Sequence, residues 1–245
     1  MSPLKTNNSY NYKVLITTSG TGSRLKNLTK ETNKALIALN GKKIIDYIIE
    51  KYPDNIELVV TIGYKGIQVR DYLVLKYLKR KITFVTIDKF EGPGSSLGFS
   101  MLQAKQYLQC PFIFHCNDTI VFDQIPSPVH FNWNGGAKGN DPTIFNTQHY
   151  SSFTVKNGVM YSIKSKGAAL YDYFHIGLAG IKDYKMFWNA LDEAYKNNPN
   201  DSALNDVVAI NKLLHEKIII KPVEFKKWFD TGNISGIEYA SKVLR

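Results

Sequence analysis

The stretch from residue 13 to residue 39, KVLITTSGTGSRLKNLTKETNKALIAL, constrains the fold of this chain more than any other. It opens with an apolar, β-branched run, Val14 to Thr18, which predicts a buried strand. A turn of small residues follows: Ser19, Gly20, Thr21, Gly22 and Ser23. Glycines there let backbone N–H groups come close to an anion, and Arg24 and Lys34 add fixed positive charge. Together these features predict a phosphate-binding loop that suits a triphosphate better than a single phosphate.

Two other interpretations of this loop explain less. Gly20 and Gly22 fit the first two glycines of the dinucleotide-binding pattern G-x-G-x-x-G, but the third position is Leu25. The second predicted strand, near 57–61, also lacks an acidic residue at its end to hold a ribose, which argues against a nicotinamide or flavin site. A loop that merely turns the chain explains the glycines but not the two cationic side chains beside them.

Composition sets the class of protein. Hydrophobic residues make up 44% of the 245 residues, enough for a single α/β domain over 1–245 with a real core. No apolar run approaches the roughly 18 residues that cross a bilayer, and the polar N-terminus lacks a signal core. The only cysteines are Cys110 and Cys116, so no disulfide framework is expected. We therefore predict a cytoplasmic protein without a membrane partner.

The net charge of +10, from 31 basic and 21 acidic residues, raises the question of nucleic-acid binding. The densest basic group, KYLKRK at 76–81, lies where a predicted helix ends, a place at which the helix dipole favours cations. An RNA-binding α/β protein would need surface platforms of aromatic and basic side chains, which we do not find in the sequence. Anionic small substrates account for the excess charge, so no nucleic-acid partner is predicted.

Strands and helices alternate in the first half of the chain. This alternation predicts a Rossmann-like α/β fold, a mostly parallel sheet with right-handed crossovers and flanking helices. Such sheets bind ligands at the carboxyl ends of their strands, so the opening loop and the end of the fourth strand should face one crevice. Strands are predicted at 14–18, 56–62, 82–87 and 112–115, and helices at 43–51, 66–77 and 95–107.

Two further segments lie on the crevice side of this predicted sheet. Asp118 follows the fourth strand; such an aspartate is often only a loop cap, but a hard carboxylate oxygen facing a triphosphate suits Mg²⁺. The third crossover contains Gly92, Gly94 and Ser96, which fit a glycine turn followed by a serine-capped helix start.

The second half is predicted to be richer in β structure. Residues 122–139 are expected to form a loop, in which Trp133 either lines a pocket or fills the core. Asn157-Gly158 is typical of a β-hairpin. His175 lies on a later predicted strand and either contacts substrate or, as is the commoner case, is packed or hydrogen-bonded. Strands are predicted at 142–147, 151–155, 158–164, 173–180 and 217–224, and helices after Asp183, after Asp201 or Ser202, and over 234–244.

The sequence resembles a known family in its opening and in a later segment. GTGSRL at 20–25, LT at 28–29 and KAL at 34–36 are similar to the G-x-G-x-R-L, LT and K-x-L opening of the sugar-phosphate nucleotidyltransferases. WFDTG at 228–232 resembles their W-x-D-T-G. These enzymes couple a nucleoside triphosphate to a phosphorylated sugar or small alcohol and release pyrophosphate.

The resemblance implies a role for each candidate residue. Arg24 would hold the leaving phosphates, and Lys34 would neutralise charge near the reacting phosphorus. Asp118 and Asp230 would hold Mg²⁺. The loop of 19–23 and the segment with Gly92, Gly94 and Ser96 would hold the nucleotide, the latter segment against the base. Residues of about 12–120 would form the nucleotide-binding half and about 121–245 the acceptor-binding half, in which Gly177 matches a family glycine.

The acceptor site departs from the family. Its sugar-specific members carry a carboxylate after the central hairpin, where this chain has Lys164, Ser165 and Lys166. The two lysines suit an acceptor phosphate, whereas the missing carboxylate disfavours a common hexose 1-phosphate. We therefore expect an NTP and a phosphorylated small molecule as partners, with a precursor of cell-surface or capsular polysaccharide as product. The alternative is a cytidylyltransferase acting on glycerol phosphate or phosphocholine, because that compact branch of the family has this size.

The alternative from another functional class is a non-catalytic, nucleotide-binding regulatory subunit with the same fold. A degenerate relative should have lost the arginine, the lysine or one of the aspartates. Arg24, Lys34, Asp118 and Asp230 are all present, which favours an enzyme. The sequence leaves the nucleotide and the oligomeric state open.

Overall fold

The computed structural model describes residues 11–138 and 148–244, so the strand predicted at 142–147 lies outside the described residues. The strands are β1 (Lys13–Thr17), β2 (Ala38–Leu39), β3 (Lys42–Lys43), β4 (Leu58–Ile62), β5 (Ile82–Thr86), β6 (Phe112–Cys116), β7 (Thr119–Val121), β8 (Asn132–Ala137), β9 (Ser152–Lys156), β10 (Val159–Lys164), β11 (Tyr173–Ile181), β12 (Ile220–Glu224) and β13 (Trp228–Asp230). The helices are α1 (Ile44–Ile49), α2 (Gly66–Lys76), α3 (Leu97–Ala104), α4 (Tyr184–Asn197), α5 (Asp206–His215) and α6 (Ile234–Val243).

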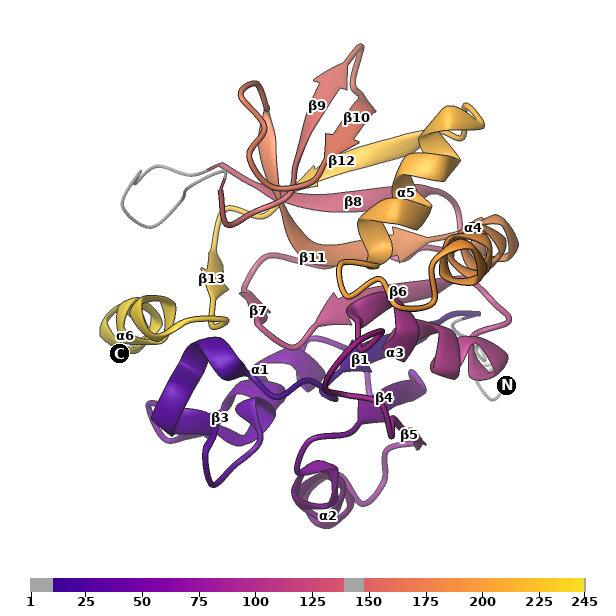
Figure 1. Cartoon of the computed structure of the whole chain (residues 1–245). Coiled ribbons are helices and arrows are strands. Elements are labelled where there is room, and N and C mark those ends of the chain that lie inside the picture. The colour runs from indigo at the N-terminus through magenta and orange to yellow at the C-terminus, as the bar shows by residue number, and fades with distance from the viewer. Residues whose placement is uncertain (1–10, 139–147, 245) are drawn as a thin grey trace, which may run out of the picture.

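A nine-stranded sheet forms the centre of the structure (Figure 1), in the order β10-β9-β11-β6-β1-β4-β5, with β8 paired to β11 and β12 paired to β8. β1 runs parallel to β4 and β6, and β4 runs parallel to β5. One core cluster includes residues of α1, α2 and α6, and the other includes residues of α3, α4 and α5. Because helices cover both faces, β1 and β4 are nearly continuous apolar runs. The predicted fold class is confirmed.

The second half of the chain extends this sheet with antiparallel strands. β11 pairs antiparallel with β6 on one side and with β8 and β9 on the other. The predicted hairpin is present between β9 and β10, where Asn157 and Gly158 have φ values of 53° and 76°. Two positive φ values at the turn are those of a type I′ turn, which matches the twist of the strands.

The prediction of a loop over 122–139 is wrong for residues 132–137, because these residues form β8, a fully buried strand of the central sheet. Its small residues fit tight spaces: a Cβ on Gly135 would lie 2.7 Å from the Leu178 carbonyl oxygen, and one on Gly136 would lie 2.6 Å from the Phe153 ring. Trp133 is fully buried, so it fills the core. Glycine composition here therefore reflects crowding rather than a turn.

Two helices begin at residues other than those predicted, and both differences affect the site. α3 begins after Ser96, whose Oγ accepts a hydrogen bond from the N–H of Phe99 at 3.0 Å, as a helix cap does. α5 was predicted to begin after Asp201 or Ser202, but it begins after Asn205. The Asn205 side chain caps the helix by accepting a hydrogen bond from the N–H of Val207. The segment of 198–205 is thereby left as a connection between α4 and α5. In the described part of the chain no helix has the length and apolar character needed to span a membrane.

Candidate active site

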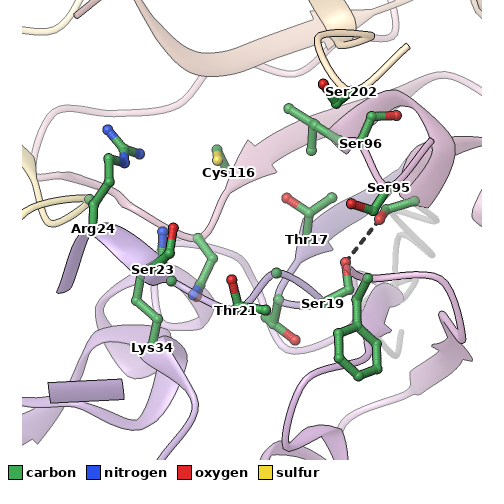
Figure 2. Close-up of a pocket in the computed structure, with 18 residues that line it drawn as sticks. Thr17, Ser19, Thr21, Ser23, Arg24, Lys34, Ser95, Ser96, Cys116 and Ser202 are labelled. Atoms are coloured by element: carbon green, nitrogen blue, oxygen red, sulfur yellow. Dashed lines mark hydrogen bonds between the residues drawn. The ribbon is translucent and has the colours of Figure 1, made fainter. Parts of the chain in front are cut away.

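A cavity of about 470 Å³ lies beside the loop that follows β1. All residues of the predicted phosphate loop, Ser19 to Ser23, line it, together with Arg24 and Lys34. Figure 2 shows Arg24 and Lys34 gathered on one side and Ser95, Ser96 and Ser202 on the other, with Thr17 between them. The cavity thus has a cationic side and a side lined with hydroxyl groups.

Asn33 fixes the position of Lys34. Its side chain is fully buried and donates hydrogen bonds to the carbonyl oxygens of Thr18, at 3.0 Å, and Tyr64, at 2.6 Å. Its Oδ1 accepts a hydrogen bond from the N–H of Ala35 at 2.9 Å, which caps the short 3₁₀ helix Lys34–Leu36. A buried amide with three hydrogen bonds holds its backbone firmly, so the lysine ammonium has a defined place.

Lys34 and Arg24 both approach Asp118. The Lys34 Nζ lies 3.1 Å from Asp118 Oδ2, and the Arg24 Nη2 lies 3.7 Å from the same oxygen. Burial by itself disfavours the carboxylate, but the two cations outweigh it and hold the pKa of Asp118 well below its usual range. Burial likewise opposes the charge on Lys34, and the Asp118 carboxylate outweighs it and raises the pKa of the lysine. Asp118 is therefore ionised and Lys34 protonated at neutral pH.

Pairing of β13 with β7 brings Asp230 to this place, because Asp230 lies opposite Thr119, the residue after Asp118. The Tyr150 hydroxyl donates a hydrogen bond to Asp230 Oδ2 at 2.6 Å, and the N–H of Gly232 donates to Oδ1 at 2.7 Å. Burial, together with the negative charge of Asp118, raises the pKa of Asp230. The two carboxylates thus share one site and repel each other.

The two aspartates fit a magnesium ion. Mg²⁺ takes hard oxygen ligands, usually one or two carboxylates together with phosphate oxygens and water. Asp118 and Asp230 supply two such carboxylates, and both line the smaller cavity. Over residues 11–138 and 148–244 no group of three or more histidine, cysteine or acidic side chains offers another metal site.

A second cavity, of about 160 Å³, adjoins the carboxylates. Arg24 lines both cavities, so it lies between them. The residues that line the smaller cavity are Arg24, Asp118, Thr119, His149, Tyr150, Ser151, Lys166, His175, Ile176, Gly177, Trp228 and Asp230. Reacting groups from two substrates could therefore meet beside Asp118 and Asp230.

The structure brings most of the predicted site residues to these two cavities but not all of them. Lys166 and Gly177 line the smaller cavity, whereas Lys164 does not. Ser96 lines the larger cavity, whereas Gly92 and Gly94 form the turn before it, with φ values of 76° and 77°. A Cβ on Gly94 would lie 2.5 Å from the Pro199 carbonyl oxygen, so this glycine allows close approach of the segment between α4 and α5.

Sequence reasoning missed several residues of the site. Tyr150 carried no signal, because its role depends on the distant Asp230. Asn33 could have been found as the polar cap before Lys34, but its bonds to Thr18 and Tyr64 depend on the fold. His175 is buried and hydrogen-bonded, as expected, and it also lines the smaller cavity.

Comparison with known proteins finds several that are similar to this chain. No protein-family model matches the sequence. The bifunctional protein GlmU of Methanococcus vannielii is 29% identical over 133 residues, which cover 54% of this chain and 30% of that protein. A probable glucose-1-phosphate cytidylyltransferase of Bacillus subtilis is 23% identical over 176 residues, or 63% of this chain and 68% of that protein. The chain spans less than a third of the length of the first curated relatives that it matches.

Among solved structures, the CTP:phosphocholine cytidylyltransferase of Streptococcus pneumoniae superposes with a TM-score of 0.79. The match covers 96% of this chain and 100% of that one at 18% sequence identity, so it shows a shared fold. The chain is related to the sugar-phosphate nucleotidyltransferases. The predicted resemblance to this family is therefore confirmed, and the two cytidylyltransferases named above are nucleotidyltransferases. The roles of the individual site residues stay predictions.

Proposed function

We propose that this nucleotidyltransferase-family chain transfers a nucleoside monophosphate from an NTP to the phosphate of a small acceptor and releases pyrophosphate. The observation that carries the proposal is the convergence of Arg24, Lys34, Asp118 and Asp230 between two cavities. The larger cavity, about 470 Å³, has room for a nucleotide, and the smaller, about 160 Å³, for a compact acceptor. Within one domain, residues of about 12–120 would bind the nucleotide and residues of about 121–245 would bind the acceptor.

The reaction needs little covalent help from the protein. An oxygen of the acceptor phosphate attacks the α-phosphorus of the NTP, a new P–O bond forms, and the bond to the β-phosphate oxygen breaks as pyrophosphate leaves. Arg24 offers a planar fork of donors to the leaving phosphates, and Lys34 offers a point charge near the reacting phosphorus. Positioning and charge neutralisation then supply the rate.

Asp118 and Asp230 would hold Mg²⁺, which neutralises phosphate charge when it is bound. Lys34 and Arg24 are placed by their ion pairs with Asp118. Tyr150 and Gly232 keep Asp230 oriented by donating hydrogen bonds to its two oxygens. Three side chains, those of Arg24, Lys34 and Tyr150, and the backbone N–H of Gly232 therefore hold the two carboxylates in place.

The names of one relative and of the structural neighbour indicate the class of acceptor. By their names, one acts on glucose 1-phosphate and another on phosphocholine. Since a carboxylate is missing after the central hairpin and Lys166 lines the smaller cavity, we place the acceptor among phosphorylated sugars or alcohols other than common hexose 1-phosphates. The product would serve as an activated precursor of a cell-surface polysaccharide, made in the cytoplasm.

A non-catalytic nucleotide-binding subunit remains the competing function. Such a subunit would retain the larger cavity but would not need two carboxylates that line a second one. Asp230 is held by three side-chain or backbone donors, from Tyr150, Gly232 and Asn233. Such support for a repelling pair of carboxylates favours catalysis over binding alone.

Pyrophosphate release over four NTPs and a panel of phosphorylated sugars and alcohols, with Mg²⁺ or with chelator, tests the proposal. Asp118→Asn and Asp230→Asn should each lower turnover about a hundred- to a thousandfold, because each removes a charge that acts in the transition state. Asp123→Asn is the matched control, since Asp123 binds the N–H of Lys227 and lines neither cavity.

Absence of pyrophosphate release from the unaltered protein with every pair of substrates would favour the non-catalytic subunit. If Asp118→Asn or Asp230→Asn retained more than about a tenth of the activity at saturating Mg²⁺, that carboxylate would not be a metal ligand. A loss in the Asp123→Asn control equal to theirs would mean that the effect is one of folding.

A further inference from the structure

His175 has one ring nitrogen held by the protein and one left over. Its Nε2 lies 2.9 Å from Asp206 Oδ2, and because the carboxylate accepts, Nε2 is the nitrogen that carries the proton. Its Nδ1 has no hydrogen-bond partner among the described residues. The residue is only 8% exposed, and it lines the smaller cavity. His175 therefore lines the cavity and carries a buried nitrogen, Nδ1, that has no partner among the described residues.

A second buried histidine shows what a purely structural arrangement looks like here. His115 is fully buried, and both of its nitrogens are bonded: the Tyr52 hydroxyl donates to Nδ1 at 2.6 Å, and Nε2 donates to the Thr119 carbonyl oxygen at 2.8 Å. Buried polar atoms in native proteins are usually paired, so the Nδ1 of His175, unlike both nitrogens of His115, suits a partner that the described residues do not supply.

His175 lies where the acceptor would be bound. β11 pairs with β6 only from Leu178 onward, and its register shifts between His175 and Ala179. β11 therefore continues to His175 past the end of β6, on the side where Asp118 follows that strand. The Thr119 hydroxyl donates a hydrogen bond to the Ile176 carbonyl oxygen, which ties the two segments together. Bulged strands of this kind often redirect a side chain next to an active site.

We propose that His175, oriented by Asp206, accepts a hydrogen bond from a hydroxyl group of the acceptor. The acceptor is then a hydroxyl-bearing phosphate, a polyol or sugar phosphate, and not the phosphate ester of a trimethylammonium alcohol. A trimethylammonium group has no hydroxyl to donate, so Nδ1 would stay buried and unpaired against its methyl groups. This inference rests on the proposed function and deepens it by naming the class of acceptor.

Two amide variants separate this role from a structural one. In His175→Gln the amide replaces Nε2 and keeps a donor for Asp206, but nothing replaces Nδ1. In His175→Asn the shorter amide replaces Nδ1, and the bond to Asp206 is lost. Each variant is assayed by pyrophosphate release with the best NTP. Glycerol 3-phosphate, ribitol 5-phosphate and glucose 1-phosphate are the hydroxylated probes, and phosphocholine and n-propyl phosphate are the probes without a hydroxyl group.

For the unaltered protein, KM for the best hydroxylated probe should be about 10- to 100-fold lower than for either probe without a hydroxyl group. His175→Gln should lose this preference through a higher KM for the hydroxylated probe, with the KM for NTP and kcat little changed. His175→Asn should keep part of the preference and unfold at a lower temperature, because the bond to Asp206 is gone.

Three results would overturn the inference. If the unaltered protein prefers phosphocholine or n-propyl phosphate, the acceptor class is wrong. If His175→Gln keeps the preference of the unaltered protein and only His175→Asn is impaired, His175 acts through Asp206 as a structural residue. If no combination of NTP and probe releases pyrophosphate, the proposed function fails, and this inference fails with it. If the unaltered protein is active and His175→Gln has the same preference among the probes, only the inference is refuted.

Discussion

Gly232→Ala adds one methyl group at the centre of the proposed active site without changing any charge. A Cβ built on Gly232 would lie 2.8 Å from Asp230 Oδ1, 3.0 Å from Asp118 Oδ2 and 3.0 Å from Arg24 Nη2. The backbone of Gly232 is not in the left-handed region, so alanine adopts it without strain. The substitution therefore tests the spacing of the charged groups alone.

Ordinary contacts with a Cβ begin at 3.4 Å, so the three polar atoms must retreat by about 0.4–0.6 Å. A misplacement of about 1 Å can cost about a hundredfold in rate, so roughly half that displacement should cost roughly tenfold. An independent figure comes from the ion pair of Lys34 with Asp118 at 3.1 Å. Lengthening it by about 0.4 Å weakens the attraction by about 0.6 kcal/mol at an effective dielectric constant of about 20. Two or three such losses together give the same tenfold.

The assay is pyrophosphate release under saturating NTP, with thermal unfolding measured alongside. We expect kcat to fall about tenfold while Tm stays level or rises slightly, because alanine restricts the unfolded chain by about 0.4–1 kcal/mol relative to glycine. Gly20→Ala is the companion variant: no atom lies within 4 Å of its added methyl group, which would extend into the larger cavity. It should raise KM for the NTP instead. Turnover of Gly232→Ala within twofold of the unaltered enzyme, or a loss accompanied by a large fall in Tm, would refute the reasoning.

Three further predictions concern single residues. Burial lowers the pKa of His115 to about 4, against about 6.5 when unfolded, so the unfolded chain binds the extra proton between these values. The free energy of unfolding should then fall by about 3 kcal/mol from pH 6.5 to pH 4, and His115→Gln should remove that share in denaturant titrations; an unchanged slope would contradict the shift. Asn33→Ala removes three hydrogen bonds of a buried amide, so the free energy of unfolding should fall by about 2–4 kcal/mol in denaturant titrations. The kcat should also fall, because Lys34 is no longer held in place. A smaller change in the free energy of unfolding would show that water replaces the amide. Arg24→Lys keeps the charge but not the fork, so turnover should fall about tenfold or more at unchanged Tm, because the Arg24 side chain is 59% exposed; near-normal kinetics would make it a solvated loop residue.

Local sequence patterns determined the first half of the fold and the positions of its site residues. The apolar run of β1 and the small residues after it predicted both the strand and the loop that lines the larger cavity. Asn157-Gly158 predicted the hairpin, because the positive φ values of a type I′ turn are a local requirement. Asp118 followed from its place after a predicted strand, since parallel strands share one carboxyl edge.

β8 could not be predicted in this way. Its glycines and asparagines are typical of a loop, and they form a central strand only because Phe153 and the Leu178 backbone lie too close for larger side chains. That crowding comes from strands far away in the sequence. No local pattern contains it.

The sequence by itself determined which chemical groups are available: a loop of small residues, two cations and two carboxylates. Only the tertiary structure decided how they are combined. The pairing of β13 with β7 sets Asp230 beside Asp118, and the fold brings Tyr150 to Asp230 and Asp206 to His175. The physical reason is range: a turn or a strand is chosen by neighbouring residues, whereas the distance between two charges depends on how the whole sheet is paired.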